Sequence, residues 1–458
     1  MDECFYKDTS SSRILSKRGM ILSDSFYGEG YDDFIVEGFE NKDEFLNCIL
    51  SFTIKEEYNP VEIFELTKCI KYLTFFVSES KESLIYSFFP AVFYEYIEEL
   101  FYLTNEKEIL YIIIAFYAQI SYKIQVEIRS MRDFTGKLFL LYNDDNKNLD
   151  QIGILCIIGN LLSEKKCVEA LTIDGWVDFL SSISNSEFSV WILSLILSIQ
   201  IPKKYVSFMV ERALFAFISN EDNESVVRNS FFCLNNLLEI VNIDTIDSIL
   251  QLFPEHIVVK IVTYANYEIV SEFVFHILLF LVQNNHHFDR VLDDIGLTQM
   301  EMILKSVPGF SVKIHVLQFL FDCISREFWE ISLHMFSIIY DLFIEGTYHE
   351  KIWSLAIISK SFLYLDSHVN GNHNAILNYI PEDFIQISLD LLLEQSVPLT
   401  LVESILDGFS TLFFRNDRFS QYLKENYSII VDMESILYNP LYQDSIVIKE
   451  SIKSIALL

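Results

Sequence analysis

The sequence of 458 residues predicts an all-α fold built from stacked helical repeats. Only 8 prolines and 13 glycines are present, too few for the closely spaced turns of a sheet protein. Apolar residues recur every three or four positions over most of the chain, as in helices that bury one face. Similar apolar helices also recur at a period of about 40 residues, which is typical of helical repeat arrays.

The charge balance restricts the class of partner. The chain has 33 basic and 65 acidic residues, a net charge of −32. Such a surface repels phosphate backbones and anionic lipid, so we predict no nucleic-acid partner and no membrane insertion. It suits a basic protein or peptide partner, although the same charge also keeps a chain with 40 phenylalanines in solution.

Cysteine usage and the charge-free runs favour an intracellular location. The seven cysteines are odd in number and contain no C-x-x-C pair, which predicts reduced thiols. The longest charge-free runs are too short for a membrane span of about 20 apolar residues. We therefore expect a cytoplasmic protein. These runs are Ile109–Tyr122, Phe188–Pro202 and Phe273–Phe288.

The first elements follow from local patterns. Residues 1–42 lack helical periodicity and mix Ser10–Ser12 with nearby arginines and lysines, which predicts a mobile tail of mixed charge. Residues 43–458 are predicted to form one repeat array. Val61–Phe76 has a single apolar face, and Leu84–Leu103 forms two short helices separated by Pro90. The nearly all-apolar Glu108–Ile124 predicts a helix covered on most sides.

Leu149–Ile183 is the reference for the later repeats. Its first helix, Ile152–Leu162, has Asn160 near the end, and helices of the same type recur along the chain in steps of about 38 to 50 residues. Gly175 follows this helix and, with Gly296 and Asn426 at the same phase, predicts a corner between helices in the left-handed conformation. The equivalent positions are Thr74, Gln119, Asn160, Ser198, Asn236, Phe280, Asp322, Ser361 and Thr411.

The segment GNLLSEKKCVEALTIDGWVDFLSSI, within Leu149–Ile183, resembles an armadillo repeat. Val226–Ile240 and Phe288–Val307 are similar to a lesser degree. The resemblance, distantly to the importin-α and β-catenin type, implies a right-handed α-solenoid of about nine to ten degenerate armadillo-like or HEAT-like repeats. In such proteins the third helix of each repeat lines a concave groove that binds a partner.

The resemblance implies where the groove lies in this chain. Importin-α adaptors hold a lysine and the peptide backbone with a Trp-x-x-x-Asn pair, whose counterparts here are Cys156/Asn160, Ser194/Ser198 and Phe232/Asn236. No pair carries tryptophan, and an alternative role for Phe232 and Asn236 is to pack a helix end against its neighbour. The predicted groove residues are Asn160, Ser198, Phe232, Asn236, Phe280, Asp322, Ser361 and Thr411.

The sequence contains no catalytic or ligand-binding motif that we recognise. Phosphate-cradling glycine loops, G-x-S-x-G and H-E-x-x-H are missing. His286 and His287 are adjacent in a predicted loop without a third ligand, which is typical of a surface rather than a metal site. His276 and His315 fall in apolar helices and are predicted to be hydrogen-bonded core residues. We therefore predict no enzyme activity, no metal and no cofactor.

Three functional hypotheses follow. The first is a non-catalytic scaffold or adaptor that binds a partner peptide or protein in the groove, with a nuclear-transport adaptor as its most specific form. The second is a regulatory subunit of a kinase-class or phosphatase-class enzyme complex, bound through the solenoid surface. The third is an enzyme of a helical class whose site the sequence does not reveal.

Overall fold

The computed structural model describes most of the predicted repeat array. The described residues are 42–126, 128–144, 151–163, 171–198, 201–242, 244–284, 297–306, 310–325, 332–363, 377, 379–394 and 397–458. They form helices and no strands. The predicted tail at 1–42, apart from its last residue, lies outside these ranges, as do Gly296, His286 and His287.

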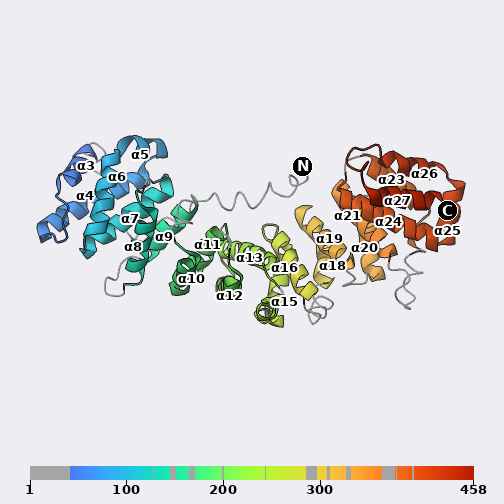
Figure 1. Ribbon diagram of the computed structural model, residues 1–458, viewed down its shortest axis with the longest axis horizontal. Helices are drawn as coiled ribbons and strands as arrows, with labels where there is room; N and C mark the ends of the chain where they lie inside the picture. Colours follow the sequence, from blue (N-terminus) through green and yellow to red (C-terminus); the bar gives the residue numbers. More distant parts are fainter. Residues whose placement is uncertain are drawn as a thin grey trace. The chain divides into compact units, whose positions relative to one another are not determined.

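The chain divides into two compact units, residues 1–245 and 246–458. Figure 1 shows each unit as a stack of short helices, blue to green in the first and yellow-green to red in the second. The first unit contains α3 (Lys42–Ser51), α4 (Pro60–Glu79), α5 (Glu82–Phe88), α6 (Ala91–Leu103), α7 (Lys107–Lys123), α8 (Met131–Tyr142), α9 (Gln151–Ser163), α10 (Ile173–Ser182), α11 (Ser186–Ile196), the short η4 (Lys203–Tyr205), α12 (Val206–Ser219) and α13 (Glu224–Glu239).

The second unit has the same kind of architecture. It contains α14 (Ile246–Leu250), α15 (Glu255–Thr263), the short η5 (Tyr264–Asn266), α16 (Ser271–Asn284), α18 (Leu297–Lys305), α19 (Phe310–Ser325), α20 (Leu333–Glu345), α21 (Tyr348–Phe362), α23 (Phe384–Glu394), α24 (Leu399–Arg415), α25 (Asp417–Glu425), α26 (Ser428–Ile436) and α27 (Ile446–Ala456).

The predicted helices are confirmed where the structure describes them. α4 contains Val61–Phe76, and α5 and α6 lie on either side of Pro90, which is the residue before α6. α7 matches the predicted all-apolar helix, and every residue from Ile112 to Ser121 is buried. The fold class is therefore the predicted all-α array of stacked helices, while the armadillo or HEAT type, the number of repeats and their handedness stay predictions.

Short polar side chains define where many helices begin. Their oxygens accept hydrogen bonds from backbone N–H groups of the first turn, which have no partner within the helix. Proline precedes other helices, because its fixed backbone angle suits a helix start. The capping residues include Asn59, Ser130, Thr172, Asn185, Asn223, Ser332, Asn416 and Ser445.

The predicted corner at Gly175 is wrong. Thr172 caps α10, and the N–H of Gly175 donates to its hydroxyl oxygen at 3.3 Å, so the glycine lies in the first helical turn. Because the Thr172 hydroxyl caps the first turn, α10 begins at Ile173, two residues before Gly175. At Asn426 a corner is present between α25 and α26, but with a φ of −122°, outside the left-handed region.

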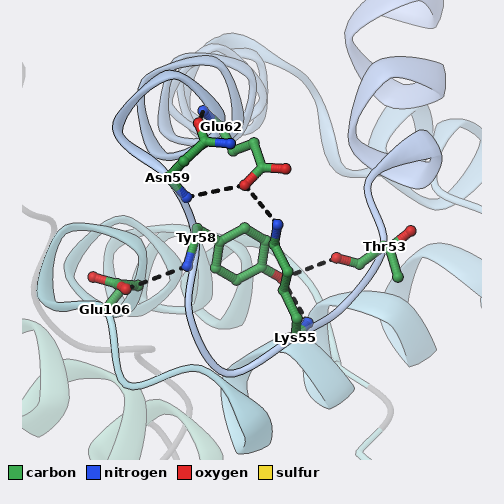
Figure 2. A network of polar contacts seen from close by, with 6 residues as sticks. All are labelled: Thr53, Lys55, Tyr58, Asn59, Glu62 and Glu106. Carbon is green, nitrogen blue, oxygen red and sulfur yellow. Dashed lines mark hydrogen bonds and ion pairs between the residues drawn. The ribbon is translucent and has the colours of Figure 1, made fainter.

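A polar network fixes the loop between α3 and α4 (Figure 2). The Tyr58 hydroxyl accepts from the N–H of Lys55 at 3.1 Å, and the N–H of Tyr58 donates to Glu106, just before α7, at 3.3 Å. Burial raises the pKa of Tyr58. Glu62 accepts from the N–H of Asn59 at 3.0 Å and pairs with Lys55 at 2.6 Å, which lowers the pKa of Glu62. The loop is thereby attached to both α4 and α7.

Candidate functional site

The helices that carry the predicted groove positions lie next to one another within each unit. In the first unit α4, α7, α9, α11 and α13 pack each against the next, and in the second unit α16, α19, α21, α24 and α27 do the same. We call these ten the ladder helices. Eight of the nine equivalent positions of the sequence repeat lie on them, and the ninth, Ser198, lies two residues beyond the end of α11, while α27 carries none. The sequence period therefore identified a real series of neighbouring helices.

Asn160 lies in the core, which differs from its predicted place in an open groove. Its side chain has an exposed fraction of 0%, and its amide donates to the hydroxyl of Ser121 on α7 at 3.2 Å. Cys156, one turn earlier, is also fully buried. The physical reason is that α9 is apolar on every side, so all its residues from Gly153 to Leu162 are covered. Asn160 connects two ladder helices rather than facing solvent.

Phe232 and Asn236 on α13 lie at the edge of the core. Phe232 is 9% exposed, and the amide of half-buried Asn236 donates to the carbonyl oxygen of Phe232 at 2.7 Å. This bond lies within α13, so it does not test the alternative that the helix end packs against its neighbour. The buried stripe of the same helix consists of Val227, Phe231, Leu234 and Leu238.

The remaining predicted positions are half-buried or exposed. Exposed Ser198 donates to Leu195, and half-buried Ser361 and Thr411 donate to carbonyls four residues earlier, at 2.8 and 3.1 Å. These hydroxyls therefore bond to their own chain segment. Phe280 on α16 and Asp322 on α19 are half-buried.

Sequence reasoning missed the role of Trp191 in the first unit. A Cβ atom at Gly159 would overlap the indole ring of Trp191, so the ring of α11 lies directly on the backbone of α9. The usable signal is Gly159 within an otherwise bulky apolar helix, since such a glycine marks a close approach of another group. Trp191 is half-buried, in partial agreement with its predicted core position.

The second unit contains a recess between two ladder helices. Glu272, His276 and Leu279 of α16 face His315, Gln318 and Asp322 of α19 around a cavity of about 20 Å³. On each helix these residues are spaced three or four apart and so share one face. The recess brings Asp322 together with an acidic side chain of the preceding ladder helix.

His315 is held in its neutral form. Its Nδ1 atom lies 2.8 Å from the hydroxyl oxygen of Ser271 on α16. Burial lowers its pKa to about 4, with a smaller contribution in the same direction from His276, while Glu268 opposes the change. At neutral pH the carboxylates of Glu272 and Asp322 therefore face an uncharged imidazole. The prediction of a hydrogen-bonded histidine is confirmed for His315, but His276 is exposed rather than in the core.

We also searched the described residues for possible metal-ion sites and for helices that could span a membrane. Among them, no three His, Cys, Asp or Glu side chains are grouped so that they could hold a metal ion. None of the described helices combines the length and apolar character needed to cross a bilayer. The five cysteines within the described ranges are thiols that form no disulfide.

Comparison with known proteins supports the fold. No protein-family model matches the sequence, and no curated protein sequence matches it. Among solved structures, an engineered protein is 13% identical with a TM-score of 0.62, over 92% of this chain and 98% of that chain. A structure from a study of a phosphorylation switch in the interaction between cadherin and β-catenin is 11% identical, with a TM-score of 0.47 and 90% of each chain covered. An importin-β structure is 12% identical with a TM-score of 0.43, over 97% of this chain and 58% of that chain.

Proposed function

We propose that the protein is a non-catalytic scaffold that binds a segment of a partner protein along the solvent-facing sides of its ladder helices. The recess between α16 and α19 is the observation that carries this proposal. Side chains of two consecutive ladder helices converge there at helical spacing, and Glu272 and Asp322 each contribute a carboxylate. Opposite charge is favoured in such a place, so the partner segment presents a lysine or arginine to the recess.

The net charge of the chain supports the same class of partner. A charge of −32 attracts basic proteins over a distance of about one Debye length and speeds their association. Phe280, one residue beyond Leu279 of the recess, is half-buried and offers apolar area to the stem of a long basic side chain. Ser361 and Thr411, on later ladder helices of this unit, extend the proposed contact surface.

The experiment compares charge reversal inside and outside the recess. Full-length protein with Glu272→Lys or Asp322→Lys is used to capture partners from the native cell, and the partners are quantified by mass spectrometry. Glu255→Lys on α15 is the matched control, because Glu255 is exposed in the same unit but is not on a ladder helix. Circular dichroism and thermal unfolding verify that each variant is folded.

We expect the two recess variants to lose the same partners while Glu255→Lys retains them. An unchanged set of partners in the recess variants would contradict binding at this site. Copurification of a kinase or phosphatase catalytic chain that resists both recess variants would instead favour the regulatory-subunit hypothesis. Phe232→Ala and Asn236→Ala test the first unit in the same assay.

A nuclear-transport adaptor is the specific form of this proposal. It requires that a basic peptide of the nuclear-signal type binds the full chain at low salt and is weakened at least tenfold by Glu272→Lys. It also requires that a fluorescent fusion of the chain exchanges between cytoplasm and nucleus. Fluorescence anisotropy without any binding at low salt would exclude this form and leave the general scaffold to be tested by copurification.

A further inference from the structure

A second surface of the first unit lies away from the ladder helices. Tyr102 at the end of α6, the outer face of α8 and Leu171 before α10 enclose an open groove with a volume of about 630 Å³. Arg132, Gly136 and Leu140 follow one another at intervals of four along α8, so they lie on one side of that helix. The groove runs along about two turns of α8.

Gly136 forms the open part of the groove. A Cβ atom at this position would meet no other atom within 4 Å. A glycine inside a helix lowers its stability relative to alanine, because the unfolded glycine is more flexible. At Gly159 and Gly408 a close neighbour leaves no room for a side chain, but at Gly136 no atom of the described residues does so. The missing side chain instead leaves space for a group from outside.

The walls of the groove are apolar and unusually exposed. Leu140 is 74% exposed, in a helix whose opposite side is buried through Phe134 and Leu138. Leu141 and Leu171 continue the apolar lining. A large aliphatic side chain that faces water beside other leucines is typical of a site that another protein covers.

The charged side chains that line the groove indicate which charge a bound partner would carry. Asp133 accepts from the Ser130 hydroxyl at 2.6 Å in the cap of α8, and Lys137 donates to the carbonyl oxygen of Tyr102 at 2.8 Å. Asp144 lines the groove just beyond the end of α8. Arg132 lies at the start of α8, is exposed, and makes no hydrogen bond or ion pair with the described part of the chain. Arg132 therefore offers a positive charge at this end of the groove, and its complement is a carboxylate.

We infer that this groove binds an amphipathic helix of a partner protein. Aliphatic side chains of that helix enter the space above Gly136 and pack on Leu140, and an acidic residue about two turns away pairs with Arg132. A helix fits because a glycine on one helix lets a second helix approach closely, and apolar residues at three-to-four spacing match the leucines of the groove. This occupant differs in charge from the basic segment proposed for the ladder helices.

The test uses a displayed library of 16-residue peptides selected on the full-length protein. The affinities of the enriched peptides are then measured against Leu140→Asp, Gly136→Leu and Arg132→Glu. Phe215→Asp is the matched control, because Phe215 on α12 is 53% exposed in the same unit but far along the chain from the groove. Thermal unfolding confirms that the variants are folded, and Glu272→Lys separates this site from the ladder-helix site.

We expect enriched peptides with aliphatic residues at helical spacing and at least one Asp or Glu. Leu140→Asp and Gly136→Leu should each weaken their binding at least tenfold, while Phe215→Asp and Glu272→Lys leave it unchanged. A peptide with its acidic residue changed to lysine should bind Arg132→Glu better than the original peptide does. Failure of any peptide to enrich, binding that ignores the groove variants, or self-association abolished by Leu140→Asp would each overturn the inference, the last in favour of a second copy of this chain.

Discussion

Gly408 on α24 lies against the backbone of Ser359 on α21, so that a Cβ atom at position 408 would stand 2.6 Å from the carbonyl carbon of Ser359. Two ladder helices of the second unit therefore meet at a glycine. Because the neighbouring atoms belong to a backbone, they cannot rotate away as the end of a flexible side chain can.

Gly408→Ala should lower the free energy of unfolding by about 1–3 kcal/mol, since the two helices must separate to admit the methyl group. Gly136→Ala is the matched control, and with open space around it we expect an increase of about 0.5–1 kcal/mol. Chemical denaturation followed by circular dichroism measures both. Equal effects of the two substitutions would contradict the close packing at Gly408.

Asn160 and Ser121 should stabilise the first unit as a pair. Asn160→Ala removes the donor of a buried hydrogen bond, leaves the Ser121 hydroxyl without that partner, and should cost about 1–3 kcal/mol. Ser121→Ala should cost less on its own, and the double variant should show a coupling energy of about 1 kcal/mol. Additive effects in a double-mutant cycle would mean that the hydrogen bond contributes nothing to stability.

Tyr442 connects two segments that are 45 residues apart in the second unit. Its hydroxyl donates to the carbonyl oxygen of Val397 at 2.6 Å and accepts from the N–H of the same residue at 2.7 Å. Tyr442→Phe leaves both backbone groups of buried Val397 without these partners, so we expect a loss of about 2 kcal/mol. Tyr438→Phe, at a site 84% exposed, is the control and should change the denaturation midpoint little.

His315 should make the stability of the second unit depend on pH. Its pKa falls from 6.5 to about 4 on folding, so between these values the unfolded chain binds a proton that the folded chain does not. The free energy of unfolding therefore decreases as the pH falls through this window, by about 1–3 kcal/mol in total, and is unaffected above it. Burial is the main cause of this low pKa, which His276 lowers further and Glu268 opposes.

Denaturation midpoints from pH 7 to pH 4 measure this dependence. His315→Gln keeps a polar group near Ser271 and should make the denaturation midpoint depend less on pH. His256→Gln, at an exposed position of α15, should leave the pH dependence unchanged. The same slope in wild type and His315→Gln would show that other groups cause the acid sensitivity.

The order of the ladder helices could be predicted from the sequence. Each of these helices buries apolar residues against the next one, so the apolar pattern recurs along the chain. The exposure of individual side chains could not be predicted in this way. Asn160 shares its phase with half-buried Asn236, yet it is buried because neighbouring helices cover all sides of α9. The apolar character of the whole of Ile152–Leu162 was the available signal, and it indicates a helix with no open face.

Contacts between helices explain the other differences. Nothing near Gly408 or Gly159 in the sequence identifies Ser359 or Trp191 as its neighbour, since those residues lie on the adjacent ladder helix. The corner predicted at Gly175 failed for a local reason, because the Thr172 hydroxyl starts α10 earlier. The groove beside Gly136 depends on three separate segments, so no sequence motif marks it.

The neutral imidazole of His315 has a consequence for how cells would regulate the recess between α16 and α19. A histidine with an ordinary pKa would gain charge in acidified compartments and oppose the attraction of Glu272 for a cation. Because His315 takes up its proton only near pH 4, moderate acidification leaves that imidazole uncharged. His315 would therefore not make the proposed binding of a cation sensitive to moderate acidification, whereas added salt would weaken that binding by screening.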